Sequence, residues 1–415
     1  TPRRQGGAEG VMKDLLSGAG EILRRLEEEG GEAVIVGGMV RDLLCGFPPC
    51  DADIASDAPL PVLASLFPSG RILGPEGMQV FLLPFGEGHC EVFPFPRGGL
   101  RDDLARRDFT VNALALRRTG EVEGSRRALA DIAARVIRFN GPGAERLAED
   151  PLRALRLARF AAVLPGFVPD PGAIRECREA RPSLERCAPE RVGREIRLGL
   201  EGNSRIFLET VKACGLLDVL FPGMPSREFD FSRLCRIQEG LAREGAPLEV
   251  RAAALFPVPG GRPSRSDDGP SRAEETLLAW KWSARSASEA AELARQRRLP
   301  LEAPDPERTA ALLEARGTPF MDSLFLLSRQ YCAGEHHFRR WSENRALYVS
   351  MAVRALRNDV LPSGAEIMKK FSLAPGPLIG ELADAVKLRR LHPGLGSKED
   401  AFRFLETLLR QNRNP

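Results

Sequence analysis

The chain has 415 residues, which is too long for one hydrophobic core and favours roughly two to four domains. Its 43% apolar and 28% charged residues are typical of a folded globular protein, and no apolar run approaches the roughly 20 residues of a membrane span. The formal net charge is only +3, so a nucleic acid would have to be bound by local basic patches and not by a global field.

The eight cysteines form no CxxC pair and have no histidine partner at zinc-ligand spacing. They are expected to be reduced thiols, which predicts a cytoplasmic protein. Residues 1–4 lack the apolar core of a signal peptide. The missing initiator Met indicates a trimmed or incomplete N-terminus.

Residues 12–26 carry apolar side chains on one face and predict a helix. The apolar run at residues 33–36 predicts a buried strand, and Gly37 and Gly38 follow it directly. Backbone N–H groups at a glycine pair before a helix can face a triphosphate at close approach. Arg41, one turn into that helix, can donate two hydrogen bonds to phosphate oxygens. A glycine pair alone is also typical of an ordinary strand-to-helix turn.

Two carboxylates, Asp51 and Asp53, stand at i and i+2 on the next predicted strand and therefore point to the same face. In a buried setting such a pair is stable mainly when cations lie between the charges, and phosphoryl and nucleotidyl transfer use two metal ions. We therefore predict Asp51 and Asp53 as catalytic residues that hold two Mg²⁺ ions.

A predicted β-hairpin at residues 79–83 and 89–95 carries Glu91 on its second strand. Glu91 is the candidate third catalytic carboxylate, beside the two aspartates on a neighbouring strand. The alternative is a solvent-facing glutamate on a half-buried strand. Other predicted elements of this region are a helix at residues 59–67, a strand or its exit at residues 111–116, and a helix at residues 128–138.

Asp150 and Arg153 lie three positions apart across Pro151, as in the first turn of a helix, so both side chains are expected on the same side. A carboxylate accepts a hydrogen bond from an exocyclic amino group, while a guanidinium donates to a ring nitrogen or a carbonyl. Cytosine and adenine present that amino group, whereas guanine and uracil present an oxygen that the carboxylate would repel. The pair is therefore predicted to select C or A, and the alternative is an ion pair on a helix surface.

These motifs follow one another as GGMVRDLLCG at residues 37–46, DAD at 51–53, RRDFT at 106–110 and EDPLR at 149–153. In this order they resemble the class II tRNA nucleotidyltransferases and bacterial poly(A) polymerases, within the polymerase β superfamily. The likeness covers roughly the first half of the chain and returns at residues 361–380. It implies that Arg106 and Arg107 contact the triphosphate together with the glycine pair and Arg41, and that Asp108 accepts the ribose 2′-OH.

Two further features are interpreted through this resemblance. Glu190, Arg191 and Glu195 resemble the ERxxxE element of the family, which implies that Glu190 and Arg191, together with Arg156, support the base-reading helix. The long flexible segment that precedes the RRDFT motif in CCA-adding members is missing, because residues 95–104 lead almost directly into that motif. In the family this loop is thought to reshape the pocket from cytosine to adenine, and its loss marks CC-adding members; a divergent loop without consequence is the alternative.

Beyond Gly202 the pattern is nearly all helical, with a Gly-, Pro- and Ser-rich stretch at residues 257–272 that predicts an exposed or disordered loop. Residues 251–257 lack the His-Asp motif of some relatives, so we expect no phosphohydrolase activity. The residues predicted to bind RNA through its backbone are Lys369, Lys370, Lys387, Arg389 and Arg390. A plain solvated helix face is the alternative.

We therefore expect an α/β nucleotidyltransferase head with a small mixed sheet, followed by all-α regions. The predicted domains are the head at residues 1–142, a base-recognition neck at 143–202, a body at 203–325 and an RNA-binding tail at 326–415. The predicted activity is addition of CC from CTP to the 3′ end of tRNA. The alternatives are a full CCA-adding enzyme that also uses ATP, a poly(A) polymerase, and a catalytically silent RNA-binding protein, against which the intact Asp51 and Asp53 argue.

Overall fold

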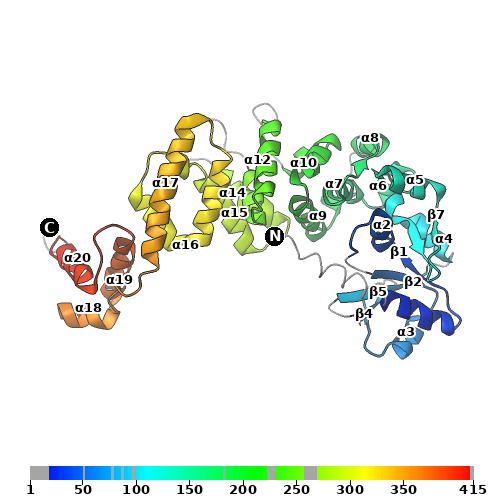
Figure 1. Cartoon of the computed structure of the whole chain (residues 1–415), viewed down its shortest axis with the longest axis horizontal. Helices are drawn as coiled ribbons and strands as arrows, with labels where there is room; N and C mark the ends of the chain where they lie inside the picture. Colours follow the sequence, from blue (N-terminus) through cyan, green and yellow to red (C-terminus); the bar gives the residue numbers. More distant parts are fainter. Residues whose placement is uncertain are drawn as a thin grey trace. The chain divides into compact units, whose positions relative to one another are not determined.

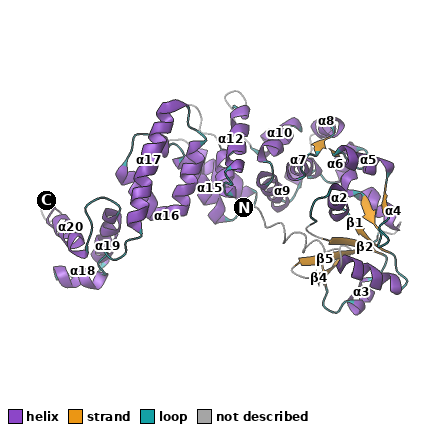
Figure 2. Cartoon of the chain, viewed as in Figure 1, coloured by secondary structure: helices purple, strands orange, loops and turns teal. Residues whose placement is uncertain are grey.

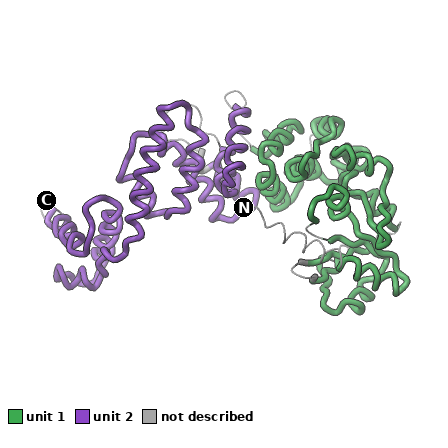
Figure 3. Tube along the Cα trace, viewed as in Figure 1, with its two compact units in different colours: residues 1–223 green, residues 224–415 purple. Residues whose placement is uncertain are grey.

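The computed structural model describes residues 18–49, 52–75, 79–85, 88–95, 99–180, 184–221, 230–256 and 269–411. The chain forms two compact units, residues 1–223 and 224–415 (Figure 3). Every described strand lies in the first unit, and the described part of the second unit is helical (Figure 2). This arrangement confirms the predicted α/β region followed by helices. The finer division into head, neck, body and tail stays a prediction.

The first unit contains a seven-stranded mixed sheet in the order β3-β4-β5-β2-β1-β6-β7. Figure 1 labels β1, β2, β4, β5 and β7 of this sheet. Only β2 and β5 pair in parallel, and the other described neighbours are antiparallel. The strands are β1 (Ala33–Val36), β2 (Ala52–Ser56), β3 (Arg71–Leu73), β4 (Val80–Phe85), β5 (Gly88–Pro94), β6 (Leu114–Leu116) and β7 (Val122–Gly124). The predicted buried strand and the predicted hairpin are therefore confirmed.

β1, at the centre of the sheet, is apolar throughout, and all four of its residues are buried. An entirely apolar strand suits a position covered on both faces. On one face Val34 and Val36 pack with Ala55 of β2 and with Leu100 of α4 (Gly99–Arg106). Of the helix predicted at residues 12–26, residues 12–17 lie outside the described residues; the described part is helical from residue 18 to residue 28 and buries its apolar side chains. The other helices before the sheet ends are α2 (Gly38–Cys45) and α3 (Leu60–Leu66).

The region after β7 departs from the sequence-based prediction at two places. The helix predicted at residues 128–138 is α5 (Arg126–Ala134), which starts at a Ser125 cap. It ends early because Arg135 adopts a left-handed conformation and the next residues form β8 (Val136–Ile137), which pairs with β9 (Val168–Pro169). The predicted strand at residues 111–116 is a strand only at β6, since its first part is the 3-10 turn η1 (Thr110–Asn112).

Helices complete the first unit and surround α7 (Arg153–Val163), which packs against α9 (Pro189–Glu201) and α10 (Ser204–Ala213). α7 is the most buried of this group, with apolar side chains such as Leu155 and Leu157 excluded from solvent. The remaining elements are α6 (Gly143–Glu149), α8 (Pro171–Ala180), η2 (Leu184–Arg186) and α11 (Leu217–Leu220).

The second unit contains α12 (Phe231–Arg243), α13 (Leu248–Ala254), α14 (Gly269–Ala279), α15 (Ala284–Gln296), η3 (Leu299–Leu301), α16 (Pro306–Arg329), α17 (Gly334–Ala355), α18 (Gly364–Phe371), α19 (Pro377–Arg390) and α20 (Lys398–Gln411). The last three share a core that includes Ile367, Leu382 and Leu405. Most of the predicted loop at residues 257–272 lies outside the described residues, but its last four residues begin α14 and are helical. In the described part of the chain, every helix is too short or too polar to cross a membrane.

Candidate active site

A polar cavity of about 580 Å³ lies in the first unit between the sheet and α7. Residues singled out from the sequence line it: Gly38, Arg41, Asp53, Arg107, Asp108, Asp150, Arg153 and Arg156. Asn112, Arg159 and Phe160 also line it and are not among the predicted residues. Arg153, Arg156 and Arg159 follow one another at intervals of three, which places guanidinium groups on one helix face. That spacing is a signal from which Arg159 could be found.

The glycine pair turns the chain sharply from β1 into α2. Gly37 has φ 76° and ψ −130°, a conformation that residues with a Cβ rarely adopt. A Cβ on Gly37 would also lie 2.5 Å from Arg107 Nη1 and 3.7 Å from Asp53 Oδ2. The turn therefore requires glycine, and it places the start of α2 beside Asp53 and Arg107, where backbone N–H groups can meet an anion.

Two carboxylates share one side of the sheet. Asp53 on β2 and Glu91 on β5 are partners in the parallel register, so their side chains point to the same face. Carboxylate oxygens are the protein ligands that Mg²⁺ prefers, and this donor set fits a divalent cation. Asp51, the other predicted metal ligand, lies outside the described residues. Within the described ranges no three metal-ligating side chains form a cluster.

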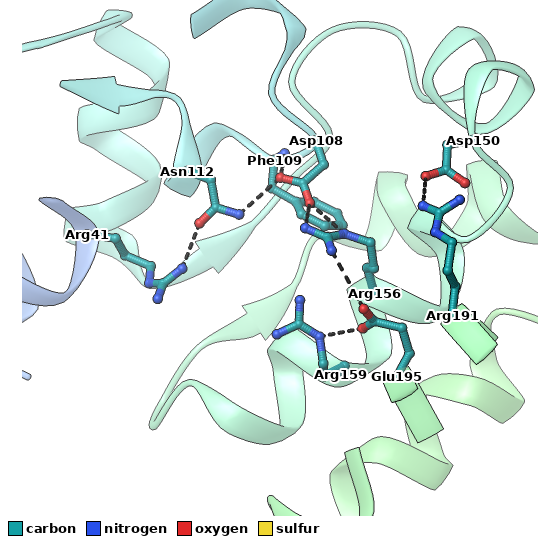
Figure 4. Close-up of polar contacts among 9 residues, drawn as sticks. All are labelled: Arg41, Asp108, Phe109, Asn112, Asp150, Arg156, Arg159, Arg191 and Glu195. Carbon is teal, nitrogen blue, oxygen red and sulfur yellow. Dashed lines mark hydrogen bonds and ion pairs between the residues drawn. The ribbon is translucent and has the colours of Figure 1, made fainter. Parts of the chain in front are cut away.

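A line of hydrogen bonds joins the start of α2 to α7 (Figure 4). Arg41 is 7% exposed, and its Nη1 donates to Asn112 Oδ1 at 2.6 Å. The amide nitrogen of Asn112 donates to Asp108 Oδ1 at 3.0 Å. Asp108 Oδ2 in turn accepts from Arg156 Nε at 2.8 Å. The asparagine amide is suited to its place because it accepts on one side and donates on the other.

Asp108 uses its full capacity as an acceptor. Oδ1 accepts from the Phe109 backbone N–H and from Asn112, and Oδ2 accepts from Nε and Nη2 of Arg156. A carboxylate has about four acceptor positions, so all are taken. Burial alone would raise the pKa of Asp108, but the charge of Arg156 and these hydrogen bonds outweigh it and hold the pKa below its ordinary value. The group is therefore charged at neutral pH.

The predicted base-reading residues both reach the cavity, from the end of α6 and the start of α7. Asp150 Oδ2 pairs with Arg191 at 2.6 Å. Arg153 Nη1 pairs with Glu149 at 2.6 Å and donates to the Arg146 carbonyl at 2.8 Å. The described contacts of Arg153 use Nη1 alone, which leaves its other donors for a ligand.

The buried carboxylate of Glu195 on α9 contacts two arginines of α7. Glu195, 5% exposed, pairs with Arg159 and lies 3.6 Å from Arg156 Nη1 (Figure 4). Arg159 also lies over the Phe160 ring, with its guanidinium carbon 3.8 Å from the ring centroid. Glu190, which the resemblance places in the same supporting role, is exposed on the first turn of α9.

Arg106 lies outside this cavity, although it precedes Arg107 in the chain. α4 ends at Arg106, and the side chain lines a second cavity together with Arg146 and Arg153. The structure thus separates two arginines that the sequence assigns to one ligand.

The basic residues predicted to bind RNA differ in exposure. Lys369 and Lys370 are exposed in the last turn of α18. Arg390 is buried, where it pairs with Glu314 and donates to Asn358, so it is not exposed as the prediction of an RNA-binding role requires. The half-buried Lys387 and Arg389 contact Asp384 and the Pro393 carbonyl.

Several known proteins are similar to this chain. A model of the poly(A) polymerase head domain matches residues 87–138. A CC-adding tRNA nucleotidyltransferase of Shouchella clausii (strain KSM-K16) is 36% identical over 222 residues, which cover 52% of this chain and 57% of that protein. A CCA-adding enzyme of Streptococcus pneumoniae (strain CGSP14) is 28% identical over 401 residues, covering 92% of this chain and 94% of the relative.

The fold is shared as well. The crystal structure of the Bacillus stearothermophilus CCA-adding enzyme in complex with CTP aligns with a TM-score of 0.73 and 24% identity, over 95% of this chain and 97% of that chain. The match to the Shouchella clausii protein spans little more than half of that relative's length. Motifs, cavity and likenesses agree: the chain is similar in sequence and in fold to class II tRNA nucleotidyltransferases, and part of it matches the head domain of poly(A) polymerases.

Proposed function

We propose that this protein adds two C residues to the 3′ end of tRNA, with CTP as the donor and pyrophosphate as the second product. The observation that carries the proposal is one cavity that joins the start of α2, Asp53 and the pair Asp150 and Arg153. Phosphate binding, metal binding and base reading thus meet within a space of about 580 Å³, which suits one nucleotide.

The phosphates are assigned to the start of α2. Backbone N–H groups after Gly37, with Arg41 and Arg107, orient the triphosphate. Asp51, Asp53 and Glu91 would hold two Mg²⁺ ions. When bound, these ions would lower the pKa of the RNA 3′-OH and neutralise the triphosphate and the departing pyrophosphate.

The base is assigned to Asp150 and Arg153. Arg191 donates a hydrogen bond to one oxygen of the Asp150 carboxylate, which fixes the direction of that side chain. Glu149 holds Arg153 through Nη1 in the same way. The carboxylate accepts a hydrogen bond from the exocyclic amino group of cytosine, and Arg153 donates a hydrogen bond to the ring nitrogen or the carbonyl beside it. The protein itself then serves as the template.

The ribose is assigned to Asp108, as the resemblance implies. Since four donors already fill this carboxylate, a ribose 2′-OH must replace one of them. Asn112 supplies the only neutral side-chain donor of the four, and a neutral hydrogen bond is weaker than those from a guanidinium. The exchange of Asn112 for the 2′-OH would favour a ribonucleotide over a deoxynucleotide.

The restriction to C is inferred from the connection between β5 and α4. β5 ends at Pro94 and α4 begins at Gly99, so only residues 95–98 are available for the loop that CCA-adding members place there. The likeness to the Shouchella clausii protein agrees with this reading. Full CCA addition is the second candidate, because the likeness to the Streptococcus pneumoniae enzyme extends over nearly the whole chain.

The test is incorporation into a tRNA that lacks its CCA end, with Mg²⁺ and with CTP or ATP singly and together, resolved at single-nucleotide length. We expect synthesis to halt after two C residues even when ATP is present. Addition of A after CC would make this a CCA-adding enzyme, and a long A ladder on unrelated RNA would make it a poly(A) polymerase. If synthesis halts after CC, grafting a flexible loop between β5 and α4 is expected to permit addition of A.

The metal assignment has its own test, the variant Asp53→Ala. It is expected to abolish incorporation while the fold, measured by circular dichroism, and tRNA binding stay largely intact. Asp218→Ala, which removes an exposed carboxylate from α11, is the matched control and should keep its activity. Turnover that survives in Asp53→Ala would contradict the assignment.

A further inference from the structure

A second cavity of about 530 Å³ lies next to the first, with Arg153 in the lining of both. α4 contributes Asp102, Ala105 and Arg106 to it, and α6 contributes Arg146 and Glu149. The resemblance assigns Arg106 to the triphosphate, but the structure turns its side chain into this other space.

The second cavity has a surplus of positive charge. Three arginines face two carboxylates, and one of these, Glu149, already bridges Arg146 and Arg153 at 3.0 and 2.6 Å. The hydrogen bond from Arg153 and the nearby arginine charges outweigh the small effect of burial and lower the pKa of Glu149, so this bridge is ionised at neutral pH. Among the described residues Arg106 has no ion-pair partner, and its guanidinium remains available to an anion.

The position of this second cavity, next to the proposed nucleotide site, limits which anion it can bind. The proposed site already supplies ligands for the nucleotide triphosphate at the start of α2 and beside Arg107. The other substrate, the acceptor RNA, must bring its terminal 3′-OH to the nucleotide, and its chain carries one phosphate for each residue. A phosphate close to the reacting end therefore has to lie next to the nucleotide cavity.

We propose that the second cavity binds a backbone phosphate of the acceptor RNA near its reacting end, with Arg106 as the principal ligand. This inference rests on the proposed function, since it assigns the second substrate of the same reaction. Arg106 and Arg107, adjacent in the chain, then serve different substrates: Arg106 holds the RNA and Arg107 holds the incoming nucleotide. Arg153 lines both cavities and contacts the base of that nucleotide. Glu149, in the lining of the second cavity, holds the Arg153 side chain in place.

The experiment is steady-state kinetics of Arg106→Gln with a tRNA lacking its CCA end and with CTP, each varied while the other is saturating. The KM for RNA is expected to rise roughly tenfold, as for loss of one charged hydrogen bond, while the KM for CTP stays unchanged. The slope of log affinity against log salt concentration should fall by about 0.7, the value for one single-strand phosphate contact. Arg106→Lys, which keeps the charge, should restore most of that slope.

Two further variants make the comparison specific. Arg101→Gln removes the same charge from an exposed position on the same helix and should leave both KM values unchanged. Arg107→Gln should raise the KM for CTP and not the KM for RNA. Direct binding of the tRNA to Arg106→Gln, measured by fluorescence anisotropy without CTP, gives a readout independent of turnover.

Three results would overturn the inference: a raised KM for CTP in Arg106→Gln, a change only in inhibition by pyrophosphate, or no change in RNA affinity. The first would return Arg106 to the triphosphate, and the second would make the cavity an exit site for the product. If the unaltered protein incorporates no nucleotide, the proposed function has failed. If it does incorporate nucleotide and Arg106→Gln binds tRNA normally, only this inference has failed.

Discussion

Gly37 has a backbone conformation that a side chain would strain, at a point where a Cβ would also meet Arg107. Gly37→Ala is expected to lower the free energy of unfolding by about 1 to 3 kcal/mol and to raise the KM for CTP, because the start of α2 must move. Gly38→Ala is the control for stability, since its Cβ would come no closer than 3.4 Å to a neighbour. Chemical denaturation of both variants measures the difference, and equal losses would contradict this account.

Asp108, the residue proposed to recognise the sugar, belongs to a buried network of charged groups. Asp108→Asn is expected to lower the preference for CTP over dCTP roughly tenfold, because an amide offers one acceptor where a carboxylate offers two. Single-nucleotide incorporation with each donor measures that ratio. An unchanged ratio would remove Asp108 from ribose recognition.

The same variant has a pH signature. The pKa of Asp108 is lowered in the folded protein, so its contribution to stability is present above the unfolded pKa, near 3.9, and is lost as pH falls through the folded value. Asp108→Asn should therefore be less stable than the unaltered protein at neutral pH, and the gap should shrink below about pH 4. Denaturation curves at pH 7 and pH 3.5 test the sign.

Single side chains could be predicted where their chemistry and spacing suffice. Gly38, Asp53 and Arg153 reach one cavity, as the motifs indicate. Asn112 could not be found in this way, because its role comes from packing η1 against α2, across 71 positions of sequence. Arg106 was predicted to share a ligand with Arg107, because two adjacent arginines look equivalent in sequence. In the structure α4 ends at Arg106, and the two side chains line different cavities.

At the scale of elements, α9 fixes α7 through Glu195. Glu195→Gln keeps the size and shape of the side chain but leaves Arg159 without its buried counter-charge and Arg156 with Asp108 alone, so the free energy of unfolding should fall by about 3 kcal/mol. The selection of CTP over UTP should weaken as well, because α7 carries Arg153. Glu190→Gln, on the exposed side of the same helix, should change stability by less than about 0.5 kcal/mol. Similar losses in both variants would contradict a specific role for Glu195.

Elements formed by local periodicity were predictable, and those set by distant partners were not. The apolar run of β1 and the helix after Gly37 follow the sequence pattern. The helix predicted at residues 128–138 was too long, since Val136 and Ile137 pair with residues 168–169 instead of extending α5. Helical periodicity contains no information about that pairing.

At the scale of the whole molecule, a net charge of +3 means that the proposed RNA binding would depend on local groups. Lys369→Gln with Lys370→Gln, at exposed positions on α18, is expected to weaken tRNA affinity and to reduce its salt dependence without affecting stability. Arg390→Gln should lower stability and leave tRNA affinity and its salt dependence unchanged, because this buried arginine pairs with Glu314 and donates a hydrogen bond to Asn358. Filter binding at several salt concentrations, with thermal unfolding alongside, separates the two effects.

The fold class was predictable because strand and helix patterns change once along the chain, from the mixed first part to the helical remainder. The place where the two units divide was not, since α10 and α11 look like any other helices of the second half but belong to the first unit. Which helices share a core depends on contacts between distant residues, and periodicity reports only local ones.

The parallel pairing of β2 with β5 brings Asp53 next to Glu91 across a connection that contains α3, β3 and β4. The cavity then needs residues as far along as Arg159, so no short stretch of chain contains a working part of the site. Such non-local pairings are slow to form. On refolding, nucleotide binding is therefore expected to return late and in one step with the sheet. A nascent chain released before α7 would hold half of its site and bind neither substrate.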